Sequence, residues 1–419
     1  MVSIERQKEN PLPILVDNSQ EPNSIAQPPV MNGNSQGKEY ISNGHAPEPA
    51  QTNDARFPSI AAPSDAPTTY LNATVDGSTT PVKTPFVHPT PSSTPATRPP
   101  LTADQQTKYN SLLNKAQFWP SVLTSSKPDA ADAPLTDSER QWLTRECLLR
   151  YLRAAKWNEA QATARVQATL VWRREYGVEE HTADYISEEN ETGKQVLLGY
   201  DNEGRPCLYL NPHLQNTKKT EKQIQHLVFM LERCIDLLPP GQETLALLCN
   251  FKESRKGDGA TVAQARQTLN ILQNHYPERL GKACVKDVPW IIWGFFKIIT
   301  PFIDPTTKEK MKFDEDLTKI VPSAQLLKKF GGDVEFKYDH KAYWPALNTL
   351  AETRRKEMRE RWEAGGKRVG ESEEYLRGRG ESVSVKDEKA KKEKMGNGTL
   401  GVGVPKLRRS PSFQDEVKS

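Results

Sequence analysis

Residues 245–251 form an almost entirely apolar run, which constrains the fold more than any other stretch of the chain. A strand that is apolar along its whole length is buried on both faces, as in a parallel sheet covered by helices. Shorter strand-like runs occur at 196–200, 207–210 and 283–285, and helical periodicity marks residues 224–238. This alternation predicts an α/β domain with a mainly parallel sheet and helices packed on it.

The sequence before this sheet predicts helices only. Thr136 and Glu139 have the spacing of a capping box, which marks the beginning of a helix, and Gly177 is a natural helix end. From these patterns we expect three folded parts: a helical N-terminal lobe at 101–180, an α/β lobe at 181–345 and a charged helix at 346–369.

Both ends of the chain have compositions that disfavour a packed core. The first hundred residues contain 17 of the 32 prolines, and such a segment buries too little apolar surface to offset its conformational entropy. Residues 351–419 contain 18 Lys and Arg against 13 Asp and Glu. This excess favours either an anionic membrane surface or simple solvation of a charged helix and a loose tail. We predict a disordered Pro/Ser/Thr-rich arm at 1–100 and a disordered basic tail at 370–419.

Residues 289–302 are apolar nearly all round, and a small α/β domain cannot bury every face of such a helix. Two interpretations stay open: the helix lies between two layers of the fold, or it is a lid that contacts a membrane. The segment is too short to span a bilayer, which needs about 20 apolar residues. The residues that carry this prediction are Trp290, Ile291, Trp293, Phe295, Phe296, Ile299 and Phe302.

The chain lacks the sequence motifs of common α/β enzymes. It has no G-x-S-x-G elbow and no G-x-G-x-x-G after the first strand, and its seven His and five Cys lack metal-ligand spacing. The odd number of widely spaced cysteines favours reduced thiols in the cytoplasm. A net charge of +3 gives no reason to expect a nucleic-acid partner. We therefore expect a binding protein rather than an enzyme, with no metal and no cofactor beyond a bound ligand.

Four segments resemble, in order, the motifs of the CRAL-TRIO lipid-transfer family: residues 148–157, 275–282, 301–310 and 330–332. Within this family the chain is most similar to fungal phosphatidylinositol-transfer proteins, especially the branch linked to azole resistance and sterol binding. The resemblance implies a helical lobe and an α/β lobe that enclose one lipid behind a mobile gate helix. It also implies exchange of that lipid between membranes, in support of phosphoinositide and lipid homeostasis.

The resemblance implies roles for individual residues. Thr307 and Lys310 match positions that contact the phosphate of phosphatidylinositol, and Glu278 matches the acid that pairs with that lysine. Ala155 stands where some relatives have an arginine that reaches the inositol site. The cavity floor is expected to include Leu245, Leu247, Cys249 and Cys284.

The strand at 245–247 departs from relatives that also bind phosphatidylcholine, because these have hydroxyl residues there. The side chains of Leu245, Ala246 and Leu247 cannot hydrogen-bond a choline phosphate, so a sterol or another apolar lipid is the expected second ligand. We also expect cytoplasmic localisation with peripheral association at the endoplasmic reticulum, cell cortex or lipid droplets. A phosphatidylinositol kinase is a candidate partner.

The alternative to lipid exchange is a regulatory scaffold or lipid sensor that acts through its arm and tail. Arg409 lies three residues before Ser412, and this pattern makes Ser410 and Ser412 candidate phosphorylation sites. A lipid hydrolase is disfavoured, because no nucleophile and base can be paired from the sequence.

Overall fold

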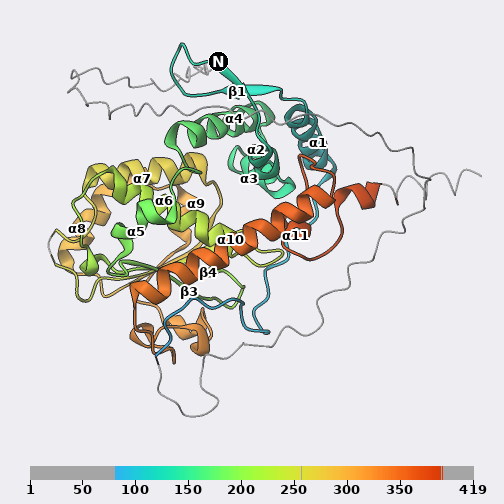
Figure 1. Cartoon of the computed structure of the whole chain (residues 1–419). Helices are drawn as coiled ribbons and strands as arrows, with labels where there is room; N and C mark the ends of the chain where they lie inside the picture. The colour runs from blue at the N-terminus through green and yellow to red at the C-terminus, as the bar shows by residue number, and fades with distance from the viewer. Residues whose placement is uncertain (1–80, 256, 388, 390–419) are drawn as a thin grey trace, which may run out of the picture. The chain divides into compact units, whose positions relative to one another are not determined.

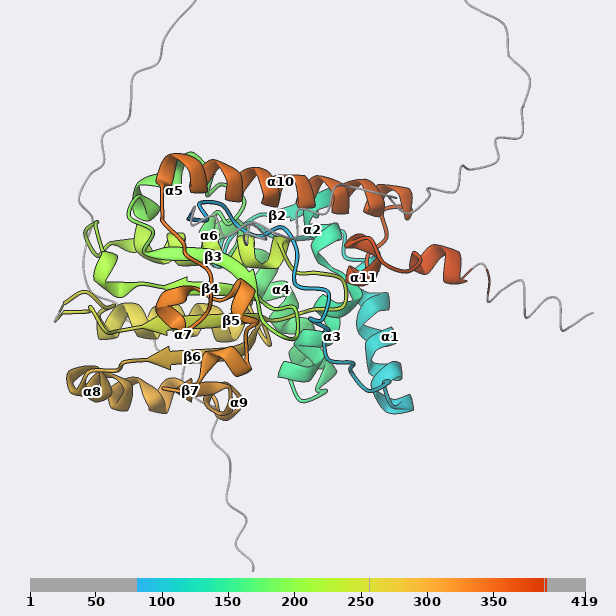
Figure 2. The ribbon, with the colours of Figure 1, turned by 90° about the horizontal axis from the view of Figure 1, so that it is seen from below.

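The computed structural model describes residues 81–255, 257–387 and 389. A five-stranded sheet lies at the centre of the α/β lobe (Figures 1 and 2), and its strands follow one another in chain order. They are β3 (Gln195–Tyr200), β4 (Pro206–Leu210), β5 (Leu245–Asn250), β6 (Leu280–Lys286) and β7 (Met311–Phe313). Only β3 and β4 pair antiparallel, and the later pairs are parallel. The predicted mainly parallel sheet is confirmed, and the apolar run forms its middle strand.

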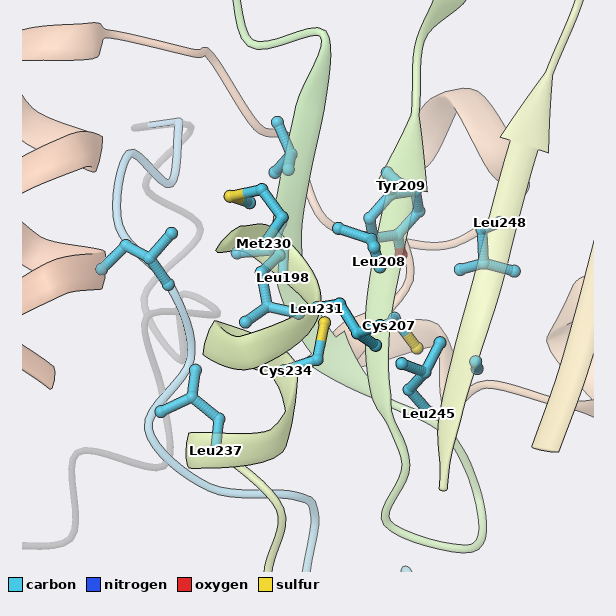
Figure 3. Close-up of a cluster of buried hydrophobic side chains, with 14 of the residues drawn as sticks. Leu198, Cys207, Leu208, Tyr209, Met230, Leu231, Cys234, Leu237, Leu245 and Leu248 are labelled. Carbon is cyan, nitrogen blue, oxygen red and sulfur yellow. The ribbon is translucent and has the colours of Figure 1, made fainter. Parts of the chain in front are cut away.

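Helices cover the sheet through the connections between parallel strands. Helix α6 (Glu221–Asp236) packs against β3 and β4, and its Met230, Leu231 and Cys234 belong to the same buried cluster as Leu198 and Leu208 (Figure 3). Between β5 and β6 lies α7 (Val262–His275). The connection from β6 to β7 contains α8 (Trp290–Ile299), the 3-10 turn η3 (Thr300–Phe302) and α9 (Pro305–Glu309).

The N-terminal lobe contains four long or medium helices and one small sheet. The helices are α1 (Ala103–Gln117), α2 (Asp137–Trp142), α3 (Arg145–Ala154) and α4 (Glu159–Tyr176), and a short helix α5 (Ala183–Ser187) leads into the α/β lobe. The capping box at Thr136 and Glu139 is present, and α4 ends at Gly177 with φ of 68°. The sheet of β1 (Ser121–Leu123) and β2 (Asp132–Pro134) was not predicted. Three residues are too few to establish an alternating pattern.

Residues 81–100, which we call the N-terminal strap, pack along the α/β lobe. Val82 forms a bridge with Phe336, the Thr94 amide donates to Asn202 O at 3.1 Å, and the Gln325 side chain donates to His88 O at 3.0 Å. The prediction of disorder up to residue 100 is therefore wrong for this part. Prolines already have a fixed φ and no N–H to satisfy, so ordering them costs less than ordering an ordinary polar segment. Residues 1–80 lie outside the described part of the chain.

The C-terminal boundaries also differ from the prediction. The charged helix is α10 (His340–Ala364), which packs against α6, and it is followed by α11 (Glu373–Leu376). Residues 370–387 are packed rather than disordered: Gly370 N donates to Leu143 O at 2.7 Å, and Arg145 N donates to Glu371 O at 2.9 Å. Buried ion pairs of Glu373 with Arg150 and Arg279 hold this segment in place. The local composition of the segment does not indicate that such ion pairs form. Ser410 and Ser412 lie outside the described residues.

Candidate functional site

One face of the sheet carries two rows of apolar side chains that cross four strands. Residues paired in a parallel register point to the same face, so each row follows from the strand pairing. The rows are Leu208, Leu247, Ala283 and Met311, and beside them Leu210, Cys249, Val285 and Phe313. Four members of these rows are only half-buried: Leu210, Leu247, Met311 and Phe313. We call this surface the apolar face.

The predicted cavity floor divides between the two faces of the sheet. Leu247 and Cys249 lie in the rows of the apolar face, and Leu245, two residues earlier on the same strand, shares it. Cys284 pairs with Leu248 and lies on the opposite face, so its assignment to the floor is wrong. Side chains alternate along β6, and therefore Ala283 and Val285 point to the apolar face in its place.

Helix α8 lies over the β7 end of the apolar face, where the ring of Trp293 is 4.8 Å from that of Phe313. Trp290 is 84% exposed, Phe302 is 44% exposed, and Ile299 is buried. The interpretation of a helix buried between two layers is therefore wrong. The side chains of Ile291, Phe295 and Phe296 lie outside the described part of the structure.

Thr307 and Lys310 are held by the short helix α9. Asp304 caps this helix by accepting from Thr307 N at 2.9 Å, and Pro305 has the fixed φ suited to a first helical residue. Lys310 ends the helix, and its carbonyl oxygen accepts from Ala283 N at 2.9 Å. The helix end is thus fixed beside the apolar face.

The side chains of Thr307 and Lys310 are unused donors. Among the described residues, neither the Thr307 hydroxyl nor the Lys310 ammonium has a hydrogen-bonding or ion-pairing partner. Burial lowers the pKa of Lys310, and the nearby carboxylates of Glu278 and Asp304 oppose that effect. A hydroxyl and an ammonium three residues apart on one helical turn can converge on a phosphate oxygen.

Glu278 lies close to Lys310, but its ion pair is with another residue. Its carboxylate accepts from Arg153 Nε at 2.5 Å, so the expected direct pairing with Lys310 is replaced by a guanidinium from α3. Glu278 also has a left-handed backbone with φ of 57°, which is uncommon outside glycine. Such strain persists where surrounding contacts fix the residue, and it is frequent at ligand sites.

A buried charge network extends from Glu278 to both lobes. Glu243 Oε2 accepts from Arg150 at 3.0 Å and from Arg153 at 3.1 Å, while Arg150 also bonds Glu373 at 2.7 Å. Burial raises the pKa of Glu243, but Arg150 and Arg153 hold it below its ordinary value. The roles of Glu243 and Glu373 were not predicted from the sequence. The only sequence feature that indicates such partners is the pair Arg150 and Arg153 on α3, because two buried guanidiniums require carboxylates.

The described residues contain no group of three His, Cys, Asp or Glu side chains that could hold a metal ion. All five cysteines are buried and unpaired. No helix in the described part of the chain is both long enough and apolar enough to cross a membrane.

Comparison with known proteins gives two family matches. Residues 190–332 match the CRAL/TRIO domain, and residues 108–168 match the CRAL/TRIO N-terminal domain.

Three curated proteins illustrate the range of similarity. A CRAL-TRIO domain-containing protein of Schizosaccharomyces pombe is 51% identical over 68% of this chain, although the match covers only 28% of that protein. The phosphatidylinositol transfer protein PDR17 of Saccharomyces cerevisiae is 40% identical over 67% of this chain and 85% of its own length. The SEC14 cytosolic factor of Kluyveromyces lactis is 29% identical over 45% of this chain and 70% of its own length.

Proposed function

This chain belongs to the CRAL-TRIO domain family, and from that premise we propose that it binds one phosphatidylinositol molecule and exchanges it between membranes. The observation that carries the proposal is the pair of unused donors on Thr307 and Lys310 beside the apolar face. The phosphate of the lipid accepts from both donors, and the acyl chains lie against the two apolar rows. Glu278 and Arg153 keep the head-group site in order.

The apolar face explains why lipid exchange needs no external source of energy. A diacyl lipid has about 30 methylene groups, and each costs roughly 0.8 kcal/mol in water, so the free lipid is effectively excluded from solution. Transfer from a bilayer to an apolar protein surface is close to neutral by comparison. Exchange therefore needs no nucleotide and no covalent chemistry, which is why we propose a carrier and not an enzyme.

Membrane contact is assigned to α8 and η3. Trp290 and Phe302 are exposed, and Lys297 supplies an exposed positive charge on the same connection. Aromatic side chains favour the bilayer interface, and lysines favour an anionic surface. We propose that this segment is the mobile gate, and that the protein associates peripherally with membranes such as the endoplasmic reticulum, cell cortex or lipid droplets.

The apolar face also limits the second ligand. Leu245 and Leu247 point to this face, whereas Ala246 lies in the row of Cys207 on the opposite face. Neither leucine can donate to a choline phosphate, so we propose a sterol or another apolar lipid and exclude phosphatidylcholine. Delivery of phosphatidylinositol to a kinase, and hence a role in phosphoinositide homeostasis, extends the same proposal.

The direct test combines lipid identification with transfer. Lipids that copurify with the full chain are identified by mass spectrometry, and transfer of phosphatidylinositol, phosphatidylcholine and sterol between liposomes is then compared. The proposal expects phosphatidylinositol in both experiments and no phosphatidylcholine transfer. Absence of phosphatidylinositol from both would overturn it.

A further inference from the structure

The N-terminal strap connects two distant parts of the α/β lobe. At one end, Lys83 forms a 3.1 Å ion pair with Asp339. At the other, Arg98 Nε lies 2.8 Å from Glu243 Oε1. Figure 2 shows this segment in blue, running from beside α10 to the start of α1. Its course therefore carries one guanidinium to the charge network of the head-group site.

Arg98 is joined to the head-group site through two shared ion pairs. Glu243 binds Arg98 with one oxygen and Arg153 with the other, and Arg153 in turn binds Glu278. Arg98 also acts to lower the pKa of Lys310, which is consistent with the two cations lying close together. The strap thus adds charge to the region that contains the unused donors.

The cations in this region outnumber the carboxylates. Four guanidiniums (Arg98, Arg150, Arg153 and Arg279) share the three carboxylates of Glu243, Glu278 and Glu373. Lys310 adds a fifth positive charge, and the nearby Asp304 adds a fourth carboxylate, so the cations exceed the carboxylates by one. No described carboxylate forms an ion pair with Lys310. A site with this balance favours an anion over a zwitterion or a neutral group.

Arg98 differs from the other guanidiniums of this network in its exposure. Its side chain is 49% exposed, whereas that of Arg150 is 4% exposed and that of Arg153 is 17% exposed. Its Nε lies 2.8 Å from Glu243 Oε1, and among the described residues its terminal Nη1 and Nη2 donate no hydrogen bond. The fork of a guanidinium suits a phosphate oxygen pair.

We propose that Arg98 is a selectivity residue of the head-group site, placed by the strap to bind the phosphate of an anionic phospholipid together with Lys310. This inference rests on the proposed function and assigns to residues 81–100 a part in ligand recognition. Loss of a half-exposed charged contact predicts a decrease of about fivefold in apparent affinity for phosphatidylinositol.

The test compares full-length Arg98→Ala with full-length Lys83→Ala. Lys83 is the matched control, because it lies on the same strap with a similarly exposed side chain (47% against 49% for Arg98), at the end that pairs with Asp339. Half-saturation by phosphatidylinositol in donor liposomes is measured at low and high salt, with thermal unfolding as a check on folding. Arg98→Ala is expected to raise the half-saturating lipid density about fivefold and to flatten the salt dependence. Arg98→Lys should lie between wild type and Arg98→Ala in both half-saturating lipid density and salt dependence.

The outcomes separate the two proposals. If wild type transfers phosphatidylinositol and Arg98→Ala behaves like Lys83→Ala, the role of Arg98 is overturned and the proposed function stands. If wild type takes up no phosphatidylinositol, the proposed function fails and this inference fails with it. Should Arg98→Ala not fold, Arg98→Gln, which keeps a donor for Glu243 without the charge, decides the question by the same measurements.

Discussion

The amide of Ala283 donates a hydrogen bond to the carbonyl oxygen of Lys310 at 2.9 Å, and this contact fixes the end of α9 to strand β6. Ala283 belongs to the apolar face, while Lys310 carries an unused ammonium. One backbone hydrogen bond therefore joins the apolar face to a side chain that can donate a hydrogen bond to a phosphate. An amphiphilic ligand with an anionic head group meets both requirements at once.

Replacing Lys310 should separate head-group recognition from apolar binding. A charge-assisted hydrogen bond contributes about 1.5–3 kcal/mol, so Lys310→Ala is expected to reduce phosphatidylinositol transfer roughly 10- to 100-fold. Uptake of a sterol should change little, because the apolar face is intact. Transfer between liposomes, measured for both lipids, checks this prediction.

Lys308→Ala is the matched control for that experiment. Lys308 lies two residues away on α9 and is exposed. Its removal should leave phosphatidylinositol transfer within about twofold of wild type. Equal loss of both lipids in Lys310→Ala, or an equal effect of Lys308→Ala, contradicts the role given to Lys310.

Trp290 gives the cleanest test of membrane contact, because it is 84% exposed, whereas Trp293 is 40% exposed and its ring lies 4.8 Å from that of Phe313. Burial of a large aromatic side chain contributes about 1.5–3 kcal/mol, so Trp290→Glu should weaken liposome binding by at least tenfold. Phe118→Glu is the control, since Phe118 is 82% exposed on the other lobe. Unchanged sedimentation of Trp290→Glu with liposomes would show that α8 does not contact the membrane.

The main elements of the fold could be predicted because their signals are local. The apolar run of β5 identifies a strand with neighbours on both sides, and the capping box at Thr136 marks a helix start within four residues. The assignment of Thr307 and Lys310 to the head group stays a prediction from a short motif, and both residues lie on one turn at α9.

The missed features depend on contacts between residues far apart in sequence. Glu243 meets Arg98 and Arg153 only in the folded chain, and no local pattern distinguishes it from a surface glutamate. The face of Cys284 was missed because a strand that is apolar on both sides does not show which residues share a face. The order of the N-terminal strap was not predicted because its composition is poor in apolar residues. Composition does not show that the strap hydrogen-bonds and packs against distant folded segments.

The two faces of β5 should differ in their contribution to stability. Leu248 is fully buried in the core, and Leu248→Ala should lower the free energy of unfolding by about 2–5 kcal/mol. Leu247 is half-buried on the apolar face, so Leu247→Ala should cost less than about 1.5 kcal/mol in the lipid-free protein. Chemical denaturation of the lipid-free variants measures both values. A larger loss for Leu247→Ala would place it in the core and remove it from the ligand surface.

Alkaline pH should affect lipid binding and stability in opposite directions. Burial, as the larger effect, lowers the pKa of Lys310 below its ordinary value of 10.5 in the folded protein. The ammonium is therefore lost at a lower pH than a free lysine would lose it, and phosphatidylinositol binding should weaken as pH rises through that lowered pKa. In the same window the unfolded chain holds this proton more tightly than the folded chain does. This group alone thus makes the lipid-free protein more stable as pH rises toward 10.5.

Lys310→Arg isolates the contribution of this one group, because a guanidinium stays charged throughout the range. The variant should keep phosphatidylinositol bound at alkaline pH, so the difference between its binding curve and that of wild type reports the titration of Lys310. Liposome transfer and chemical denaturation are measured on both proteins between pH 7 and about 10.5. If wild type and Lys310→Arg lose binding at the same pH, another group controls the site, and Lys310 does not supply the charge that the phosphate requires.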